Sequence, residues 1–135
     1  MRKPPMARLD HFEFAVKGYP VGKGRPKFTV RAGRATAYTP KATQAAEANV
    51  AACYRRAAGW HEVDPLAWYR VDAVFYLPDR RRSDVDNLIK LLLDGLNGIA
   101  WKDDNQVMMA CGRKVLASPE PHTSVRITQL KQETP

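Results

Sequence analysis

The side chains best suited to chemistry are concentrated between residues 83 and 107. This run contains five aspartates and, within the expected helix, one lysine: Asp84, Asp86, Asp94, Asp103, Asp104 and Lys90. The chain has a formal net charge of +8, yet acids this close together repel one another unless a cation lies among them. Carboxylates without His or Cys neighbours are hard oxygen ligands, which suit Mg²⁺ or Mn²⁺ better than zinc. The run therefore predicts a site for a divalent metal ion.

A single polar stripe follows the helix expected within this run. Between residues 85 and 97, apolar side chains cover most of the helical circumference, which is typical of a helix packed in an interior or an interface. The polar stripe is spaced by four, four and three residues: Asp86, Lys90, Asp94 and Asn97. We expect this stripe to open onto a cleft, where Lys90 could neutralise charge on a phosphate or hold a metal-bound water. Alternatively, Lys90 only forms an i, i+4 ion pair, worth about 0.3–0.5 kcal/mol.

Helix capping is the structural alternative for the first two acids. Asp84 and Asp86 stand where the helix is expected to begin, and backbone amides favour negative charge there. Ser83 and Asp86 also have the spacing of a capping box. Capping does not account for Asp103 and Asp104, which follow the helix. The metal-site hypothesis accounts for both groups.

A strongly basic segment precedes the acidic run. No Asp or Glu occurs between residues 14 and 46, while glycine, proline, lysine and arginine accumulate and Tyr19, Phe28 and Tyr38 are interleaved. Such a loop or ribbon suits phosphate contacts with some base stacking, although a basic segment that is merely solvated remains the alternative. The predicted DNA contacts, including two arginines just before the acidic run, are Lys23, Arg25, Lys27, Arg31, Arg34, Lys41, Arg81 and Arg82.

The apolar pattern predicts one α+β domain that spans residues 1–135. Expected strands cover residues 11–16, 67–77, 106–116 and 123–130, and expected helices cover residues 40–58 and 83–98. The order β-α-β-α-β-β implies a mixed sheet of about four strands with two main helices. We expect residues 1–10 and 131–135 to be flexible tails.

Several classes of protein are disfavoured by composition. Cys53 and Cys111 lie far apart without a Cys-x-x-Cys pair, so a structural zinc site is not expected. No apolar stretch approaches the roughly 20 residues of a membrane span, and the first residues do not continue into a secretory apolar core. We therefore expect an intracellular, cytoplasmic protein that does not bind membranes.

Two groups of motifs closely resemble the RusA-type Holliday junction resolvases. The first comprises RRRSDVDNLIK at residues 80–90, DGLNG at 94–98 and WKDDNQV at 101–107. The second lies upstream, with GKGRPKFT at residues 22–29 and YTPK at 38–41, and the resemblance spans roughly residues 12–130. It implies a small homodimeric endonuclease of DNA recombination and repair. Such an enzyme uses Mg²⁺ to cut four-way DNA junctions symmetrically and leaves 5′-phosphate and 3′-hydroxyl ends.

The resemblance also implies roles for individual residues. By position, the family's metal-binding acids match Asp84, Asp86 and Asp104, and its catalytic lysine matches Lys90, while Asp94 and Asp103 are supporting candidates. A two-fold dimer suits a two-fold junction, and the apolar second helix is a candidate for part of that interface. Two alternatives remain: a non-catalytic protein that binds branched DNA, and a nuclease that acts on flaps or forks.

Overall fold

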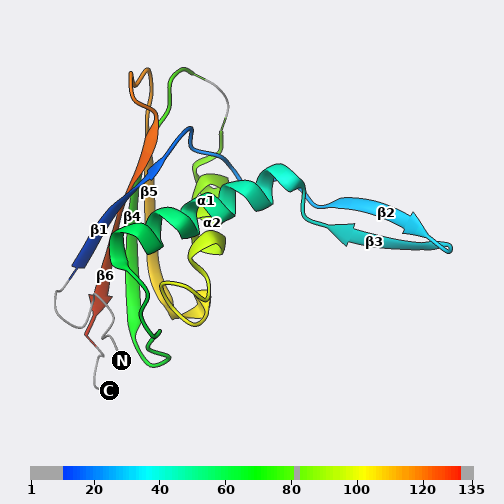
Figure 1. The fold of residues 1–135 in the computed structure, drawn as a ribbon. Helices are drawn as coiled ribbons and strands as arrows, with labels where there is room; N and C mark the ends of the chain where they lie inside the picture. Colours follow the sequence, from blue (N-terminus) through cyan, green and yellow to red (C-terminus); the bar gives the residue numbers. More distant parts are fainter. Residues whose placement is uncertain (1–10, 81–82, 132–135) are drawn as a thin grey trace.

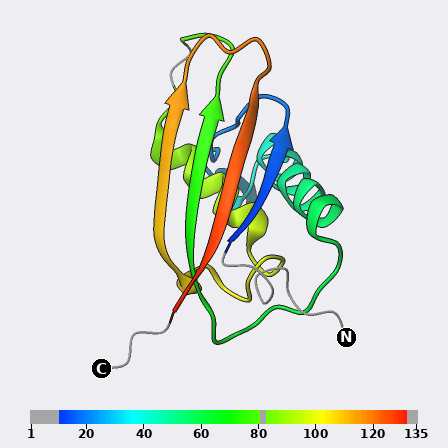
Figure 2. The same cartoon turned by 90° about the vertical axis from the view of Figure 1, so that its left-hand side faces the viewer.

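A four-stranded sheet carries both long helices on one face. The computed structural model describes residues 11–80 and 83–131. The elements in chain order are β1 (His11–Lys17), β2 (Lys27–Arg31), β3 (Arg34–Tyr38), α1 (Lys41–Ala58), β4 (Trp68–Tyr76), α2 (Val85–Leu96), a short 3₁₀ helix (Asp104–Gln106), β5 (Val107–Val115) and β6 (His122–Leu130). Figure 1 shows the helices on one side of the sheet, and Figure 2 shows the uncovered side. The predicted α+β class and element order are confirmed, and the basic segment adds the β2–β3 hairpin.

The strand order is β1-β6-β4-β5. β6 is antiparallel to both β1 and β4, whereas β4 and β5 are parallel. Parallel neighbours need a crossover connection, and α2 provides it. The start of α2 therefore follows the end of β4, while the end of α2 leads back to the start of β5. Asp84, which precedes α2, and Asp104, which follows it, consequently lie toward opposite ends of the helix.

The core lies between the inner face of the sheet and the two helices. β4 alternates strictly between inner residues such as Val71 and Phe75 and outer residues such as Arg70 and Asp72. In α2, five residues are buried within this single chain: Leu88, Leu91, Leu92, Gly95 and Leu96. Its own sheet and α1 cover most of this apolar helix, while Val85, Ile89 and Leu93 are only partly buried; its contribution to a dimer interface stays a prediction.

Gly95 allows the two helices to approach closely. A Cβ atom at this position would lie 2.8 Å from Cβ of Val50 and 3.0 Å from the carbonyl oxygen of Glu47. A larger residue would push α2 away from α1. This contact fixes the position of α2, and with it the position of the polar stripe.

The helix ends differ slightly from those predicted. α1 begins at Lys41 after Pro40, without a side-chain cap, and Gly59 ends it with a φ of 74°. α2 ends before Asn97 and Gly98, and Gly98 has a φ of 76°. Of the expected flexible tails, residues 1–10 and 132–135 lie outside the described residues. In the part of the chain that is described, no helix is both long enough and apolar enough to cross a membrane.

Candidate functional site

The polar stripe of α2 lies at the surface of the domain. Asp86 and Lys90 are exposed, and the Lys90 side chain keeps 62% of its accessible area, while Asp94 is half-buried. The stripe was expected to line a cleft; a hollow that the structure shows on the other side of the sheet contains none of its residues. A surface stripe remains accessible to a large ligand such as a nucleic acid.

Asp84 and Asp86 do not cap α2. Asp84 occupies the N-cap position, yet its side chain accepts no hydrogen bond from the helix. Within residues 11–80 and 83–131, neither side chain takes part in a hydrogen bond or an ion pair. The capping box expected from Ser83 and Asp86 is therefore wrong, and neither acid side chain is held by a direct contact in the described fold. Both remain exposed to solvent.

Asp94 belongs instead to an ion-pair cluster around Lys23. The Nζ atom of Lys23 lies 2.9 Å from Oδ2 of Asp94 and 2.6 Å from Oε1 of Glu47. The hydrogen bond to Asp94 raises the pKa of Lys23 most, and the hydrogen bond to Glu47 raises it further. By comparison, Lys90 approaches the same oxygen of Asp94 only to 3.9 Å. Lys23 was predicted as a DNA contact, but it joins α1 and α2 at the base of the β2–β3 hairpin.

Other contacts fix the hairpin base in the same place. The backbone N–H of Lys23 donates to the carbonyl oxygen of Asn87 over 3.1 Å, and the N–H of Gly24 donates to Oγ1 of Thr43 over 3.2 Å. A Cβ atom at Gly24 would lie 2.5 Å from that oxygen, so a larger residue would force the Thr43 side chain to move. These contacts, together with the Lys23 ion pairs, form what we call the Lys23 clamp. It holds the hairpin base against the helix that carries the polar stripe.

Asp104 is held at the other end of α2. The indole Nε1–H of Trp101, a fully buried side chain, donates to Oδ1 of Asp104 over 2.7 Å. The backbone N–H of Asp104 donates to Oδ1 of Asn97 over 2.9 Å. Burial raises the pKa of Asp104, the Trp101 hydrogen bond opposes this, and the negative charges of Asp94 and Asp103 raise it further. The ionised carboxylate is therefore less stable here than in water, and a cation beside it would relieve that cost.

Asp103 has a structural role. Its side chain accepts a hydrogen bond from the backbone N–H of Asn105. In turn, the backbone N–H of Asp103 donates to Oε1 of Gln106 over 3.1 Å. This capping box begins the 3₁₀ helix that leads into β5. The supporting candidates Asp94 and Asp103 thus position other groups.

The carboxylates suit a magnesium ion chemically, but the described side chains do not gather around one point. No group of three or more His, Cys, Asp or Glu residues within the described ranges lies close enough to hold a metal ion. α2 rises about 1.5 Å per residue, so Asp86 and Asp94 are separated by about 12 Å along its axis. Asp104 lies near the Asp94 end, while Asp84 and Asp86 lie at the start. As placed, the three predicted metal ligands therefore do not form one site.

The remaining predicted DNA contacts are mostly exposed. Five of them lie on or beside the hairpin and are solvent-exposed: Arg25, Lys27, Arg31, Arg34 and Lys41. Arg81 and Arg82 lie outside the described residues. The hairpin projects from the body of the domain, as Figure 1 shows.

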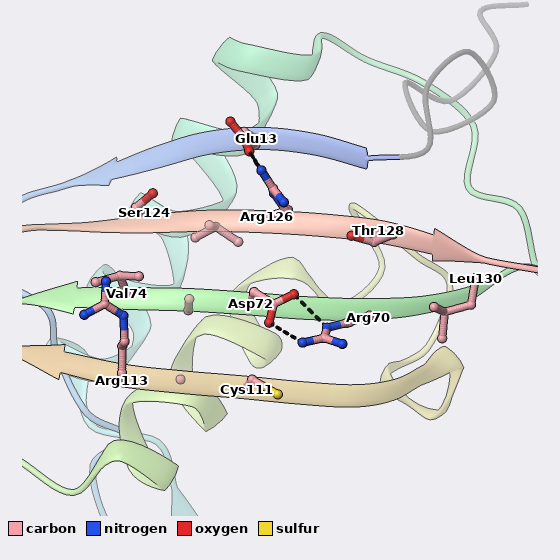
Figure 3. Close-up of a pocket in the computed structure, with 13 residues that line it drawn as sticks. Glu13, Arg70, Asp72, Val74, Cys111, Arg113, Ser124, Arg126, Thr128 and Leu130 are labelled. Carbon is pink, nitrogen blue, oxygen red and sulfur yellow. Dashed lines mark hydrogen bonds and ion pairs between the residues drawn. The ribbon is translucent and has the colours of Figure 1, made fainter.

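A broad hollow lies on the uncovered face of the sheet, opposite α2. It encloses about 760 Å³ (Figure 3). Its charges are largely paired: Arg70 donates two hydrogen bonds to Asp72, over 2.9 and 3.1 Å, and Arg126 donates to Glu13 on the neighbouring strand. This hollow contains no part of the acidic stripe and offers no gathered group of acids.

Sequence reasoning did not assign roles to three residues that shape the site. Trp101 and Asn97 hold Asp104, and Glu47 shares Lys23 with Asp94. The i, i+3 spacing of Trp101 and Asp104 within one motif was a usable signal for the first contact. Glu47 carried no such signal, because its partner lies 24 residues away.

Comparison with known proteins adds one finding. A family model described as Endodeoxyribonuclease RusA matches residues 17–128, which is most of the chain. No curated protein matches the chain significantly.

Replacement of Asp104 by Asn is expected to stabilise the protein at pH 7. Because the pKa of Asp104 is raised in the folded state, the folded protein binds this proton more tightly than the unfolded chain does. The ionised carboxylate therefore costs stability above both pKa values, whereas Asn avoids the charge and still accepts from Trp101. Below the unfolded pKa of about 4, the gain should disappear. Urea unfolding between pH 3 and 7 measures it, with the exposed Glu120→Gln as control. A gain that does not change with pH would contradict the assigned cause.

The Lys23 clamp predicts a coupling between Lys23 and Asp94. Lys23→Met leaves two half-buried carboxylates without their shared cation, so it should lower the free energy of unfolding by about 1–2 kcal/mol. The loss should be smaller when Asp94 is already Asn. A double-mutant cycle measured by urea unfolding tests this, with Lys102→Met as an exposed-lysine control. Strictly additive losses would show that the two side chains do not interact.

Proposed function

Because the chain belongs to the RusA endodeoxyribonuclease family, we propose that it is a Mg²⁺-dependent nuclease that resolves four-way DNA junctions. One observation carries this assignment beyond the family match. The base of an acid-free, basic hairpin is tied through Lys23 to Asp94, on the helix that bears the acidic stripe. A surface for phosphates and a set of carboxylates are thereby adjacent, which is the combination that phosphodiester hydrolysis requires.

The proposed catalytic residues are Asp84, Asp86, Lys90 and Asp104, with the three acids as the metal-binding groups. A bound magnesium ion would polarise the phosphate and lower the pKa of a water. The chemistry and charge of these acids support a metal-binding role. Asp84 and Asp86 are exposed and unpaired in the described chain, and the pKa of Asp104 is raised. In the described part of the chain, the three carboxylates do not gather around one point.

The protein's own groups have simpler proposed roles. Lys90 is exposed, so its ammonium group can reach a phosphate that lies along α2 and neutralise charge on its oxygens. The Nζ atom of Lys23 lies 2.9 Å from Oδ2 of Asp94, whereas that of Lys90 lies 3.9 Å away, so Asp94 does not hold Lys90 tightly. Trp101 fixes the direction of the Asp104 carboxylate through a hydrogen bond from a fully buried ring.

Conservative replacement of the proposed catalytic acids should abolish cleavage without loss of the fold. Asp84→Asn, Asp86→Asn and Asp104→Asn are each expected to slow junction cleavage by at least about 100-fold, while Glu120→Gln cuts normally. Added Mg²⁺ should also raise the melting temperature of the wild type more than that of Asp104→Asn, because a ligand stabilises the state that binds it.

Synthetic four-way junctions, flaps, forks and linear duplexes with a common sequence provide the comparison of substrates. Junctions should be cut fastest. Faster cleavage of flaps or forks would assign a different substrate to the same chemistry. Binding without any cleavage, unaffected by Mg²⁺ and by Asp104→Asn, would instead identify a non-catalytic branched-DNA-binding protein.

We also propose that the active form is a homodimer, because two related incisions across a two-fold junction are most simply made by two related sites. Light scattering at micromolar concentration should give twice the chain mass of 15.2 kDa. A monomer under these conditions, with or without DNA, would contradict the paired-site proposal.

A further inference from the structure

The β2–β3 hairpin has two chemically different faces. Directly paired residues of antiparallel strands share a face, and the register pairs Lys27 with Tyr38, Thr29 with Thr36 and Arg31 with Arg34. These six polar or basic side chains form what we call the basic face. The intervening pairs form the apolar face: Phe28 with Ala37, and Val30 with Ala35. Every residue from Lys27 to Tyr38 is exposed.

The apolar face has no partner within the described part of the chain. Phe28 and Val30 keep 70% and 71% of their accessible area, although a ribbon of only two strands has little stability of its own. The hairpin projects away from the sheet and helices, so the body of the domain does not cover it (Figure 1). Large apolar side chains at such a position indicate a binding surface.

The positive charge of the hairpin indicates which kind of partner it binds. Three cations, Lys27, Arg31 and Arg34, occupy the basic face, and no acid occurs between residues 14 and 46. Two copies of this hairpin would repel each other if they paired, because they bring like charges together. A polyanion is attracted along the whole ribbon, which favours nucleic acid as the occupant.

We propose that the hairpin recognises the branch point of DNA by using both faces at once. The basic face lies on phosphates, while Phe28 and Val30 contact bases that are unstacked where the arms diverge. A continuous duplex offers the phosphates but keeps its bases stacked, whereas a branch point offers both. Apolar side chains are known to insert at such disrupted steps, and base–aromatic stacking contributes about 1–3 kcal/mol. This inference rests on the proposed function only in taking branched DNA as the ligand.

The Lys23 clamp connects this recognition to the acidic stripe. Lys23 lies just before β2 and contacts Asp94 and Glu47, so the hairpin base is tied to α1 and α2 by ion pairs. Each five-residue strand extends about 17 Å at 3.3 Å per residue. DNA held by the hairpin is therefore positioned relative to Lys90 from a distance, without contact between the hairpin tip and the scissile phosphate.

Binding measurements without Mg²⁺ separate this inference from the proposed cleavage. Fluorescence anisotropy in EDTA compares a four-way junction with a linear duplex of the same sequence. Phe28→Ala should weaken junction binding by about 5- to 150-fold and leave duplex binding within about two-fold of the wild type. Arg31→Gln should weaken both, while the exposed Arg56→Gln on α1 should change neither.

A base analogue reports the contact directly. 2-Aminopurine placed at the branch should change fluorescence with the wild type and not with Phe28→Ala. Equal losses on junction and duplex, or no loss with Phe28→Ala, would overturn the proposal. A change in sedimentation of the free protein with Phe28→Ala would instead identify the apolar face as a protein–protein contact. If the wild type binds junctions in this way but never cuts them, the proposed function fails while this inference stands.

Discussion

The one-sided burial of α2 is the constraint on which the rest of the structure depends. As the crossover between two parallel strands, α2 must lie against the sheet, and Gly95 allows α1 to press against it closely. Burial of its leucines leaves only one line of polar residues outside. Asp86, Lys90 and Asp94 are therefore displayed at fixed helical intervals, and their relative positions do not depend on a loop.

Around this helix, the acids differ in what holds them. Asp94 is neutralised by Lys23, and Asp103 caps a short helix. Asp104 is fixed by a buried tryptophan, in surroundings that disfavour its charge. Asp84 alone occupies a cap position without capping. An acid that lowers the stability of the fold, or that makes no structural contact, is a good candidate for a functional role. This difference separates the proposed metal ligands from Asp94 and Asp103.

Much of the fold followed from local patterns in the sequence. Apolar and aromatic bulk predicted β4 to within about one residue, and the apolar circumference with its single stripe predicted α2. The strand expected at residues 123–130 matches β6 to within one residue. The family resemblance was confirmed over residues 17–128. The Lys23 clamp was not predictable, because it joins residues 24 and 71 positions apart through side-chain geometry that no local pattern records. For the same reason, the ion pairs of Lys23 could not be read from the sequence, and its predicted DNA contact stays a prediction.

We propose that the acidic stripe of α2 and the neighbouring Asp104 perform phosphodiester hydrolysis on branched DNA. The most direct measurement is to map, at nucleotide resolution, the products of a synthetic four-way junction incubated with the purified protein and Mg²⁺. We expect paired incisions at symmetry-related positions in two opposing strands, which disappear when EDTA replaces the metal. An intact junction at protein concentrations that saturate binding, or incisions that persist in EDTA, would contradict this proposal.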